Sequence, residues 1–271
     1  MNKIEIYCTT IKHYKVMEKL PNFVIPLGLG EEKYPNNWLT EKVGKNISSL
    51  NKYYAEFTGL YWIWKNKIDN LDNNDLIGNC HNRVLWLNEL IENKKKFTND
   101  SLFENFLKQE NSILKNTDVI QVQPITFEKK NLLEDFEEIH KCDALEKSVA
   151  YLDQTLSKKF LKHLEGNHLF PHNMFITKKT FFIEYCEIIF PWLEKCFTYC
   201  KNKNLCKSYN SRLPAFLAER FTSFWFSEFK NRKLLSYARL GKLHLSNNIN
   251  NFVNTTKIPF TFYQYPTIHR Y

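Results

Sequence analysis

The chain has 271 residues, of which 43% are hydrophobic, and a formal net charge of +9. This length allows one sizeable core, while every apolar run is interrupted well short of the roughly 20 residues that a membrane-spanning helix needs. The N-terminus has no hydrophobic export signal, and seven cysteines, an odd number, favour reduced thiols. We therefore expect a cytoplasmic protein.

The positive charge predicts an acidic partner, and nucleic acid, an anionic membrane surface and a phosphorylated small molecule are all compatible with it. A denser basic cluster borders the aromatic C-terminal segment, and it favours peripheral contact with the inner membrane. Its members are Lys230, Arg232, Lys233, Arg239 and Lys242. The aromatic residues fall at the spacing of helix cores rather than along a strand, which argues against a nucleic-acid partner.

In chain order, residues 3–9 and 22–27 predict strands, and the first ends at Thr9 and Thr10. Residues 46–66 predict a long aromatic helix after a polar turn that contains Asn46 and Ser48. Its apolar stripe consists of Tyr53, Phe57, Leu60, Tyr61 and Trp64, and its opposite face of Glu56, Thr58 and Lys65. Residues 76–80 predict a strand that ends at His81, Asn82 and Arg83.

The second half predicts further alternation of helices and strands. We expect helices at 84–93, 101–115, 180–199 and 212–229, strands at 118–123 and 173–177, and an extended stretch in the tail after residue 249. Residues 131–164 predict helices that start at Asn131, Asp143 and Asp153. This pattern indicates an α/β domain with a mostly parallel sheet.

Ligands of such sheets bind beyond the carboxyl ends of the strands. Three places follow from this rule: Thr9/Thr10, His81/Arg83 and His172/Asn173. A guanidinium and an imidazole at a strand end could neutralise a diphosphate, although both could equally pair with surface carboxylates. Glu219, in an aromatic helix, is a candidate general base; the plainer alternative is an ion-paired carboxylate.

Other chemistries find little support in the sequence. Cys196, Cys200 and Cys206 form a cluster, but their spacing matches no zinc module, and we expect no metal there. Cys80 and His81 would point to opposite faces of a strand, which excludes a thiol–imidazole pair. The chain contains no P-loop, serine nucleophile elbow, His-Glu-x-x-His motif or Asp-x-Asp pair.

Four segments resemble one family of bacterial capsular-polysaccharide biosynthesis proteins, catalogued as a domain of unknown function, with galactofuranosyltransferase-type members. NISSLNKYYAEFTGLYWIWKN resembles its block NISEKNxxYCELTxLYWxWKN, and LIGNCHNR resembles IGLxHYRR. HNMFITKKTFFIEYCEIIFPWL resembles NMFIMKKxxFxxYCxWLF, and RLPAFLAERF resembles RxxGFLAERL. The matches keep their order over residues 3–229.

The resemblance implies a GT-A-like, Rossmann-like glycosyltransferase domain at 1–229 with a mostly parallel central sheet and flanking helices. Residues 230–271 have no counterpart in the family blocks, and their composition predicts a basic, aromatic extension packed on the same domain. It implies transfer of a hexose, with galactofuranose the specific guess, from a nucleotide sugar, most plausibly UDP-linked. The acceptor would be a lipid-linked or growing capsular or surface glycan. No other cofactor is implied with certainty; a divalent ion is compatible, but the sequence lacks the Asp-x-Asp motif.

Site residues follow from the same resemblance. Donor binding is expected from Thr9, Thr10, Asn46, Ser48, His81 and Arg83. Acceptor or sugar binding is expected from His172, Asn173, Arg212 and Arg220. Glu219 would be the base of an inverting displacement.

The chain also departs from the family pattern at three places. A family His is replaced by Thr10 or displaced to His13, an Asp before NIS is Lys45, and HYRRYF is reduced to His81-Asn82-Arg83-Val84. These losses support an alternative function, a catalytically degenerate binding or scaffold protein of the same polysaccharide pathway.

Overall fold

The computed structural model describes residues 2–90 and 104–240. A nine-stranded sheet forms the centre of this part of the chain, in the order β10-β6-β9-β4-β1-β2-β3, with β5 paired to β4 and β11 paired to β5. The strands are β1 (Ile4–Thr10), β2 (Val24–Gly28), β3 (Leu39–Thr40), β4 (Leu76–His81), β5 (Val84–Trp86), β6 (Val119–Val122), β9 (Phe175–Lys178), β10 (Arg232–Leu235) and β11 (Tyr237–Arg239). A separate pair joins β7 (Ile125–Thr126) to β8 (His168–Leu169).

The sheet is mostly parallel, as the sequence predicts. Strands β1 to β4 run parallel, and β10 runs parallel to β6, whereas β9 is antiparallel to both β4 and β6. Thr9 pairs in register with His81, and Gly78 pairs with Ile176. Because β9 is reversed, its amino end lies at the same edge as the carboxyl ends of β1 and β4.

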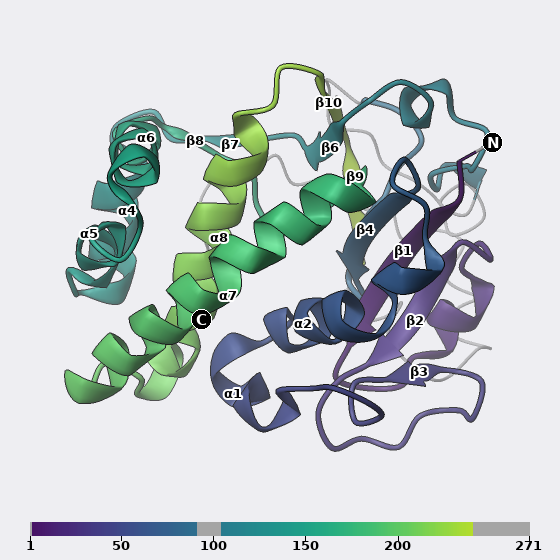
Figure 1. The fold of residues 1–271 in the computed structure, drawn as a ribbon, viewed down its shortest axis with the longest axis horizontal. Helices are drawn as coiled ribbons and strands as arrows, with labels where there is room; N and C mark the ends of the chain where they lie inside the picture. Colours follow the sequence, from purple (N-terminus) through teal and green to yellow (C-terminus); the bar gives the residue numbers. More distant parts are fainter. Residues whose placement is uncertain (1, 91–103, 241–271) are drawn as a thin grey trace, which may run out of the picture.

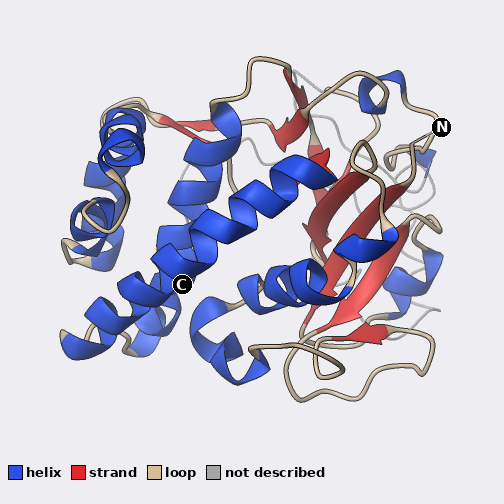
Figure 2. Ribbon diagram, in the orientation of Figure 1, coloured by secondary structure: helices blue, strands red, loops and turns tan. Residues whose placement is uncertain are grey.

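The α-helices gather on one side of the sheet (Figure 1, Figure 2). They are α1 (Asn51–Tyr54), α2 (Phe57–Asn66), α4 (Leu132–His140), α5 (Ala144–Val149), α6 (Gln154–Leu164), α7 (Lys179–Asn202) and α8 (Leu213–Ser227). Short 3-10 turns are η1 (Lys15–Lys19), η2 (Ser48–Leu50), η3 (Ile68–Asn70), η4 (Ser112–Leu114) and η5 (Ser208–Arg212). In Figure 1, α7 and α8 lie between the sheet and the group formed by α4, α5 and α6.

Helix starts follow the polar residues that the sequence singles out. Asn131 caps α4 in a capping box with Glu134, and Asp153 caps α6 by accepting the N–H groups of Thr155 and Leu156. Asp143 precedes α5 without a side-chain cap. The three predicted starts are confirmed.

The aromatic stretch at 46–66 is not one helix, and this expectation was wrong. Ala55 adopts a positive φ of 48° and separates α1 from α2. Its carbonyl, released from the helical pattern, accepts hydrogen bonds from Asn51 Nδ2 and Thr58 Oγ1. The break places Glu56 at the N-cap of α2, where the helix dipole stabilises negative charge.

Gly59 in α2 is explained by a close approach to the sheet. A Cβ at this position would lie 2.9 Å from Leu29 Cδ2 and 3.1 Å from Thr9 Cγ2. The cost of about 1 kcal/mol that glycine carries in a helix is therefore offset by packing α2 directly on β1. This contact fixes the start of α2 relative to the end of β1.

The helical face contains an aromatic-rich core. Phe160, Trp192, Phe221 and Phe224 pack together with ring centroids 4.9–6.2 Å apart. Full burial of such side chains contributes on the order of 1.5–3 kcal/mol each. This core holds α6, α7 and α8 together and gives α8 a fixed position over the sheet.

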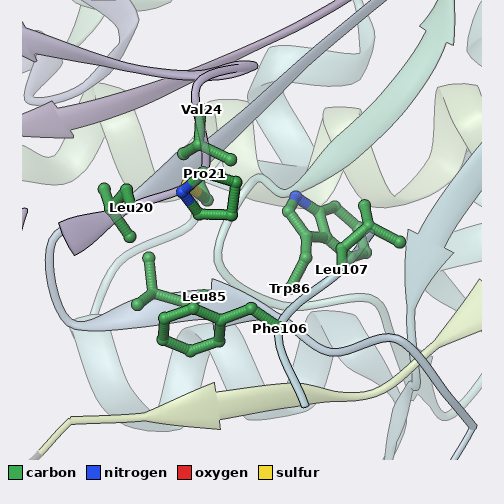
Figure 3. A pocket seen from close by; sticks show the side chains of 8 residues that line it. Leu20, Pro21, Val24, Leu85, Trp86, Phe106 and Leu107 are labelled. Atoms are coloured by element: carbon green, nitrogen blue, oxygen red, sulfur yellow. The ribbon is translucent and has the colours of Figure 1, made fainter. Parts of the chain in front are cut away.

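The opposite face carries a second, smaller core and an apolar crevice (Figure 3). The crevice lies between the segment before β2, strand β5 and the segment around Phe106. Its lining residues are Leu20, Pro21, Val24, Cys80, Leu85, Trp86, Phe106 and Leu107. It offers no polar group for recognition and belongs to the packing of this face.

Two predicted helices are wrong. Within the expected helix at 84–93, Val84–Trp86 is strand β5, which follows a tight Asn82–Arg83 turn and pairs with β4 and β11. Pairing to two strands outweighs the local helical spacing. Of the expected helix at 101–115, the described part is mostly loop with η4, and residues 91–103 lie outside the described residues.

The start of the predicted C-terminal extension belongs to the central sheet, because β10 pairs with β6 and β11 pairs with β5. The basic cluster does not form one patch. Arg232 stacks on Phe170 at 4.6 Å and donates to Gln121 Oε1, whereas Lys233 is exposed. Lys242 and the aromatic tail lie outside the described residues. No helix in the described ranges combines the length and apolar character needed to cross a bilayer.

Candidate functional site

A chain of hydrogen bonds crosses the carboxyl edge of the sheet from β1 to β9. His81, the last residue of β4, places Nε2 against the carbonyl oxygen of His172, so Nε2 is the protonated nitrogen. Its Nδ1 lies 3.1 Å from Thr9 Oγ1, which is also 3.3 Å from the carbonyl of Cys80. Thr9 therefore fixes the orientation of the His81 ring.

The turn before β9 has a strained backbone. His172 and Asn173 adopt consecutive left-handed conformations, with φ of 69° and 52°, a combination that costs free energy for residues other than glycine. Asn79, buried in β4, holds the turn. Its Nδ2 donates to the Asn173 carbonyl at 2.6 Å, and its Oδ1 accepts the Phe175 N–H at 3.1 Å.

The His172 ring lies among cations. Burial, together with the smaller effects of nearby His81, Arg239 and Arg83, lowers its pKa to about 3. The ring is therefore neutral at physiological pH. Its Nε2 is buried and has no hydrogen-bond partner among the described residues, while Tyr237 packs edge-on against it at 5.0 Å.

Two carboxylates from different helices meet the same turn. Glu219 of α8 accepts the His172 N–H at 2.7 Å through Oε1 and Arg220 at 3.0 Å through Oε2. Glu56, at the start of α2, accepts Asn173 Nδ2 at 2.6 Å. Asn173 Oδ1 is buried and unpartnered within the described residues. The turn therefore brings basic side chains near the His172 ring, while two carboxylates bind the His172 N–H and the Asn173 side chain.

Of the other donor-site predictions, Thr10, Asn46 and Ser48 form local turns. Thr10 is buried; its Oγ1 accepts the Lys12 N–H and its hydroxyl donates to the Lys12 carbonyl. Asn46 Oδ1 accepts the N–H and the hydroxyl of Ser48, and Asn46 is exposed. Within residues 2–90 and 104–240, the side-chain hydrogen bonds of Asn46 and Ser48 stay inside their own turn and do not reach His81.

The predicted acceptor residues on α8 have different surroundings. Arg212 is exposed at the N-cap of α8. Arg220 is buried and paired with Asp135 of α4 at 3.2 Å and with Glu219. Its guanidinium therefore holds α4 to α8 and lies away from any surface that an acceptor could reach.

Four residues at or near this edge were not predicted as site residues. Glu56 was assigned to the solvent face of an unbroken helix, and Arg239 to a membrane-binding cluster. Asn79 lies inside a strand and carried no signal. Glu41, fully buried beside the Gly30 turn, accepts the Gly30 N–H at 2.8 Å, and burial raises its pKa. Of these four residues, only Glu56 carried a signal in the sequence, because it is an acidic residue at the start of a helical segment.

Residues that could hold a metal ion were sought over the same ranges. In residues 2–90 and 104–240, no three His, Cys, Asp or Glu side chains are grouped so that they could bind one. Cys196 and Cys200 are buried in α7, and Cys200 shares a hydrogen bond with Cys206.

The chain is similar in sequence to one protein family and similar in fold to a solved structure. The family model described as "Domain of unknown function (DUF4422)" matches residues 5–232. No curated protein matches the chain. An apo structure of the WbbM bifunctional glycosyltransferase has a TM-score of 0.73 and 17% identity, over 89% of this chain and 46% of that one. The chain thus spans about half the length of that protein, and at this identity the likeness is one of fold.

Proposed function

The chain belongs to the DUF4422 family, and from this premise we propose that it is a glycosyltransferase of bacterial polysaccharide synthesis with a GT-A-like domain. It moves a hexose, with galactofuranose as the specific guess, from a nucleotide sugar to a capsular or surface glycan. The likeness in fold to a bifunctional glycosyltransferase supports this proposal. The observation that carries it is the turn at His172–Asn173, which has basic side chains near its imidazole ring and two carboxylates hydrogen-bonded to it.

The cationic side suits a nucleoside diphosphate. His81 and Arg83 lie at the carboxyl end of β4 and just beyond it, and Arg239 ends β11. All three lie close enough to the His172 ring to lower its pKa. Guanidinium groups match phosphate oxygens in geometry and charge, so this group would stabilise the diphosphate as it leaves with the electron pair of the sugar–phosphate bond.

The carboxylate side suits an acceptor hydroxyl. In an inverting displacement, the acceptor oxygen attacks the anomeric carbon, the bond to the diphosphate breaks, and Glu219 takes the hydroxyl proton. Each carboxylate oxygen offers two lone-pair directions, so Glu219 Oε1 can keep the His172 N–H and still receive a proton. Glu56 binds the next residue of the turn and orients the Asn173 side chain. The unpartnered Oδ1 of Asn173 could accept a hydrogen bond from a sugar hydroxyl.

Calorimetric titration tests the donor half of the proposal. We expect UDP or a UDP-hexose to bind the wild-type protein, and Arg83→Ala to weaken binding about tenfold or more, as loss of a charge-assisted hydrogen bond does. Lys233→Ala, which removes an exposed cation from β10, is the matched control. If no nucleoside diphosphate and no nucleotide sugar binds the wild-type protein, the proposal is wrong.

A transfer assay tests the catalytic half. Glu219→Gln should retain nucleotide binding and lose transfer. Glu56→Gln should retain a larger share of kcat, because it keeps an oxygen to accept Asn173 Nδ2. The opposite order of the two variants would assign the base to Glu56. Binding without transfer in the wild-type protein would favour the degenerate binding or scaffold protein.

Partners and location follow the same proposal. A lipid-linked acceptor would place the protein at the cytoplasmic face of the inner membrane, with peripheral contact only. Of the basic cluster, Arg239 belongs to the candidate site and Arg232 is engaged with Phe170 and Gln121. A vesicle flotation assay with anionic lipid would show whether such contact occurs.

A further inference from the structure

Helix α8 has one accessible stripe that begins at the candidate site. Among its first eight residues, all are buried except Phe216 and Glu219. Arg212, the N-cap residue, is exposed and continues the stripe seven positions before Glu219. A rise of 1.5 Å per residue separates the two by about 10 Å along the helix. The stripe therefore leads from the carboxylate side of the site to the amino end of α8.

An exposed aromatic ring lies at the far end of this stripe. Tyr209 of η5 is 61% exposed, and its ring stacks on Phe216 with centroids 5.4 Å apart and planes 24° apart. It also lies parallel to His140, at 5.8 Å and 14°. Most large apolar side chains of this protein are buried, so an exposed tyrosine supported by other rings is a distinctive surface feature.

The rings beneath Tyr209 are firmly held. His140 is buried and packs on Phe136 and Phe216 at 4.3 and 4.7 Å. Asn210, the neighbour of Tyr209, makes two hydrogen bonds to His140. Its Oδ1 accepts from His140 Nδ1 at 2.8 Å, and its Nδ2 donates to the His140 carbonyl at 2.9 Å. The segment that carries Tyr209 is thereby fastened to α4, and the ring is pre-organised for contact.

We propose that Tyr209, Phe216 and Arg212 form a subsite for the acceptor glycan, beyond the sugar unit that reacts at Glu219. This inference rests on the proposed function and names how the same site extends. A sugar ring has an apolar face of C–H groups that packs on aromatic rings, and hydroxyls around its rim that accept from a guanidinium. The stripe supplies these two features in continuity with the reacting position.

The separation from Glu219 determines the kinetic signature. Arg212 lies about 10 Å from Glu219 along α8, more than one sugar unit, and Tyr209 precedes Arg212 in η5. We therefore expect a monosaccharide acceptor at Glu219 to stop short of this end of the stripe and a longer acceptor to reach it. The subsite then contributes binding to long acceptors and leaves the chemical step unchanged. Its loss should raise KM for long acceptors and leave kcat and short-acceptor kinetics as they are.

The test compares Tyr209→Ala with Tyr209→Phe on a fluorophore-labelled hexose oligosaccharide series, from monosaccharide to hexasaccharide. For Tyr209→Ala, we expect KM on the hexasaccharide to rise about tenfold, with the monosaccharide unaffected; tenfold corresponds to about 1.4 kcal/mol. Tyr209→Phe should behave as wild type, because the ring is retained. Tyr61→Ala, which removes a half-buried tyrosine stacked edge-on against Phe190 at 5.1 Å, is the matched control.

The outcomes separate this inference from the proposed function. If the wild-type protein transfers sugar but Tyr209→Ala changes KM equally for all acceptor lengths, or not at all, the subsite is overturned and the glycosyltransferase stands. If the wild-type protein transfers nothing, the proposed function fails. Calorimetric binding of the hexasaccharide then decides the subsite separately: binding that depends on Tyr209 supports it, and binding that does not, or no binding, overturns it.

Discussion

Glu219 joins two regions of opposite electrostatic character. On one side, in the contact between α4 and α8, Arg220 meets Asp135 and Glu219, and Asp135 also pairs with Lys130 at 3.1 Å. On the other side, at the sheet edge, the His172 ring lies near His81, Arg83 and Arg239. Buried charges are paired in the first region, whereas the second gathers these three basic side chains around a neutral imidazole.

The difference distinguishes structural charge from functional charge. A balanced buried pair holds two helices in one arrangement and offers nothing to a ligand. Basic side chains gathered around a neutral imidazole form a site that an anion would stabilise. The buried, unpartnered Nε2 of His172 and Oδ1 of Asn173 add polar atoms that a ligand could satisfy.

Breaking the buried ion pair between Arg220 and Asp135 should have the largest effect on stability. Arg220→Ala leaves Asp135 buried without its main partner, and we expect a loss of about 3–5 kcal/mol in the free energy of unfolding, measured by urea denaturation. Lys130→Ala removes the partially exposed partner of the same carboxylate and should cost less than about 1 kcal/mol. Equal losses for the two variants would contradict the assignment of Arg220 as the structural partner.

The second largest loss of stability is expected when the strained turn at His172–Asn173 loses its support from Asn79. Asn79→Ala leaves the Asn173 carbonyl and the Phe175 N–H without their partners, at a cost of about 2–3 kcal/mol, and should also weaken nucleotide binding. Asn231→Ala, which removes an exposed side-chain bond to the Asn116 carbonyl, is the matched control and should be nearly neutral. An Asn79 variant that keeps full stability would show that the turn holds itself.

Histidine titration should separate the two regions. The pKa of His172 is lowered to about 3, below its unfolded value of about 6.5, so the unfolded chain binds more protons below pH 6.5. Stability present above pH 6.5 is therefore lost as the pH falls, by about 1 kcal/mol between pH 6.5 and 5.5 from this residue. The difference in unfolding free energy between wild type and His172→Gln over this range measures it.

A bound anion should alter only one of these titrations. The pKa of His140 is lowered to about 4, chiefly by burial, with Arg220 and Asp135 acting in opposite directions. A nucleoside diphosphate at the edge would offset the cations and raise the pKa of His172, and it should leave His140 unchanged. NMR titration of the ring protons with and without UDP checks this, and a shift at both residues would contradict the separation.

The smallest effect on stability is expected at Arg83. Its side chain is exposed beyond β4, so Arg83→Ala should change the free energy of unfolding by less than about 0.5 kcal/mol while weakening nucleotide binding. A melting curve recorded beside the calorimetric titration makes the comparison. A destabilised variant would place Arg83 with Arg220, among the structural charges.

The sequence predicts much of the sheet edge, because strand ends are marked by local pattern. Thr9, His81, His172 and Asn173 were expected from separate segments, and hydrogen bonds join Thr9 to His81 and His81 to His172. Glu56 was missed because a single positive φ at Ala55 breaks the helix and no glycine marks the break. Arg239 was missed because β11 reaches the edge only by pairing with β5, far away in the sequence.

The Asn79 clamp has a consequence for how the molecule folds. It joins β4 to a turn 94 residues further along the chain, and closing so long a loop carries an entropic cost that local helices do not share. The helices can form early, but the left-handed turn lacks both Asn79 hydrogen bonds until β9 docks on β4. The candidate site is therefore expected to be among the last parts of the protein to assemble.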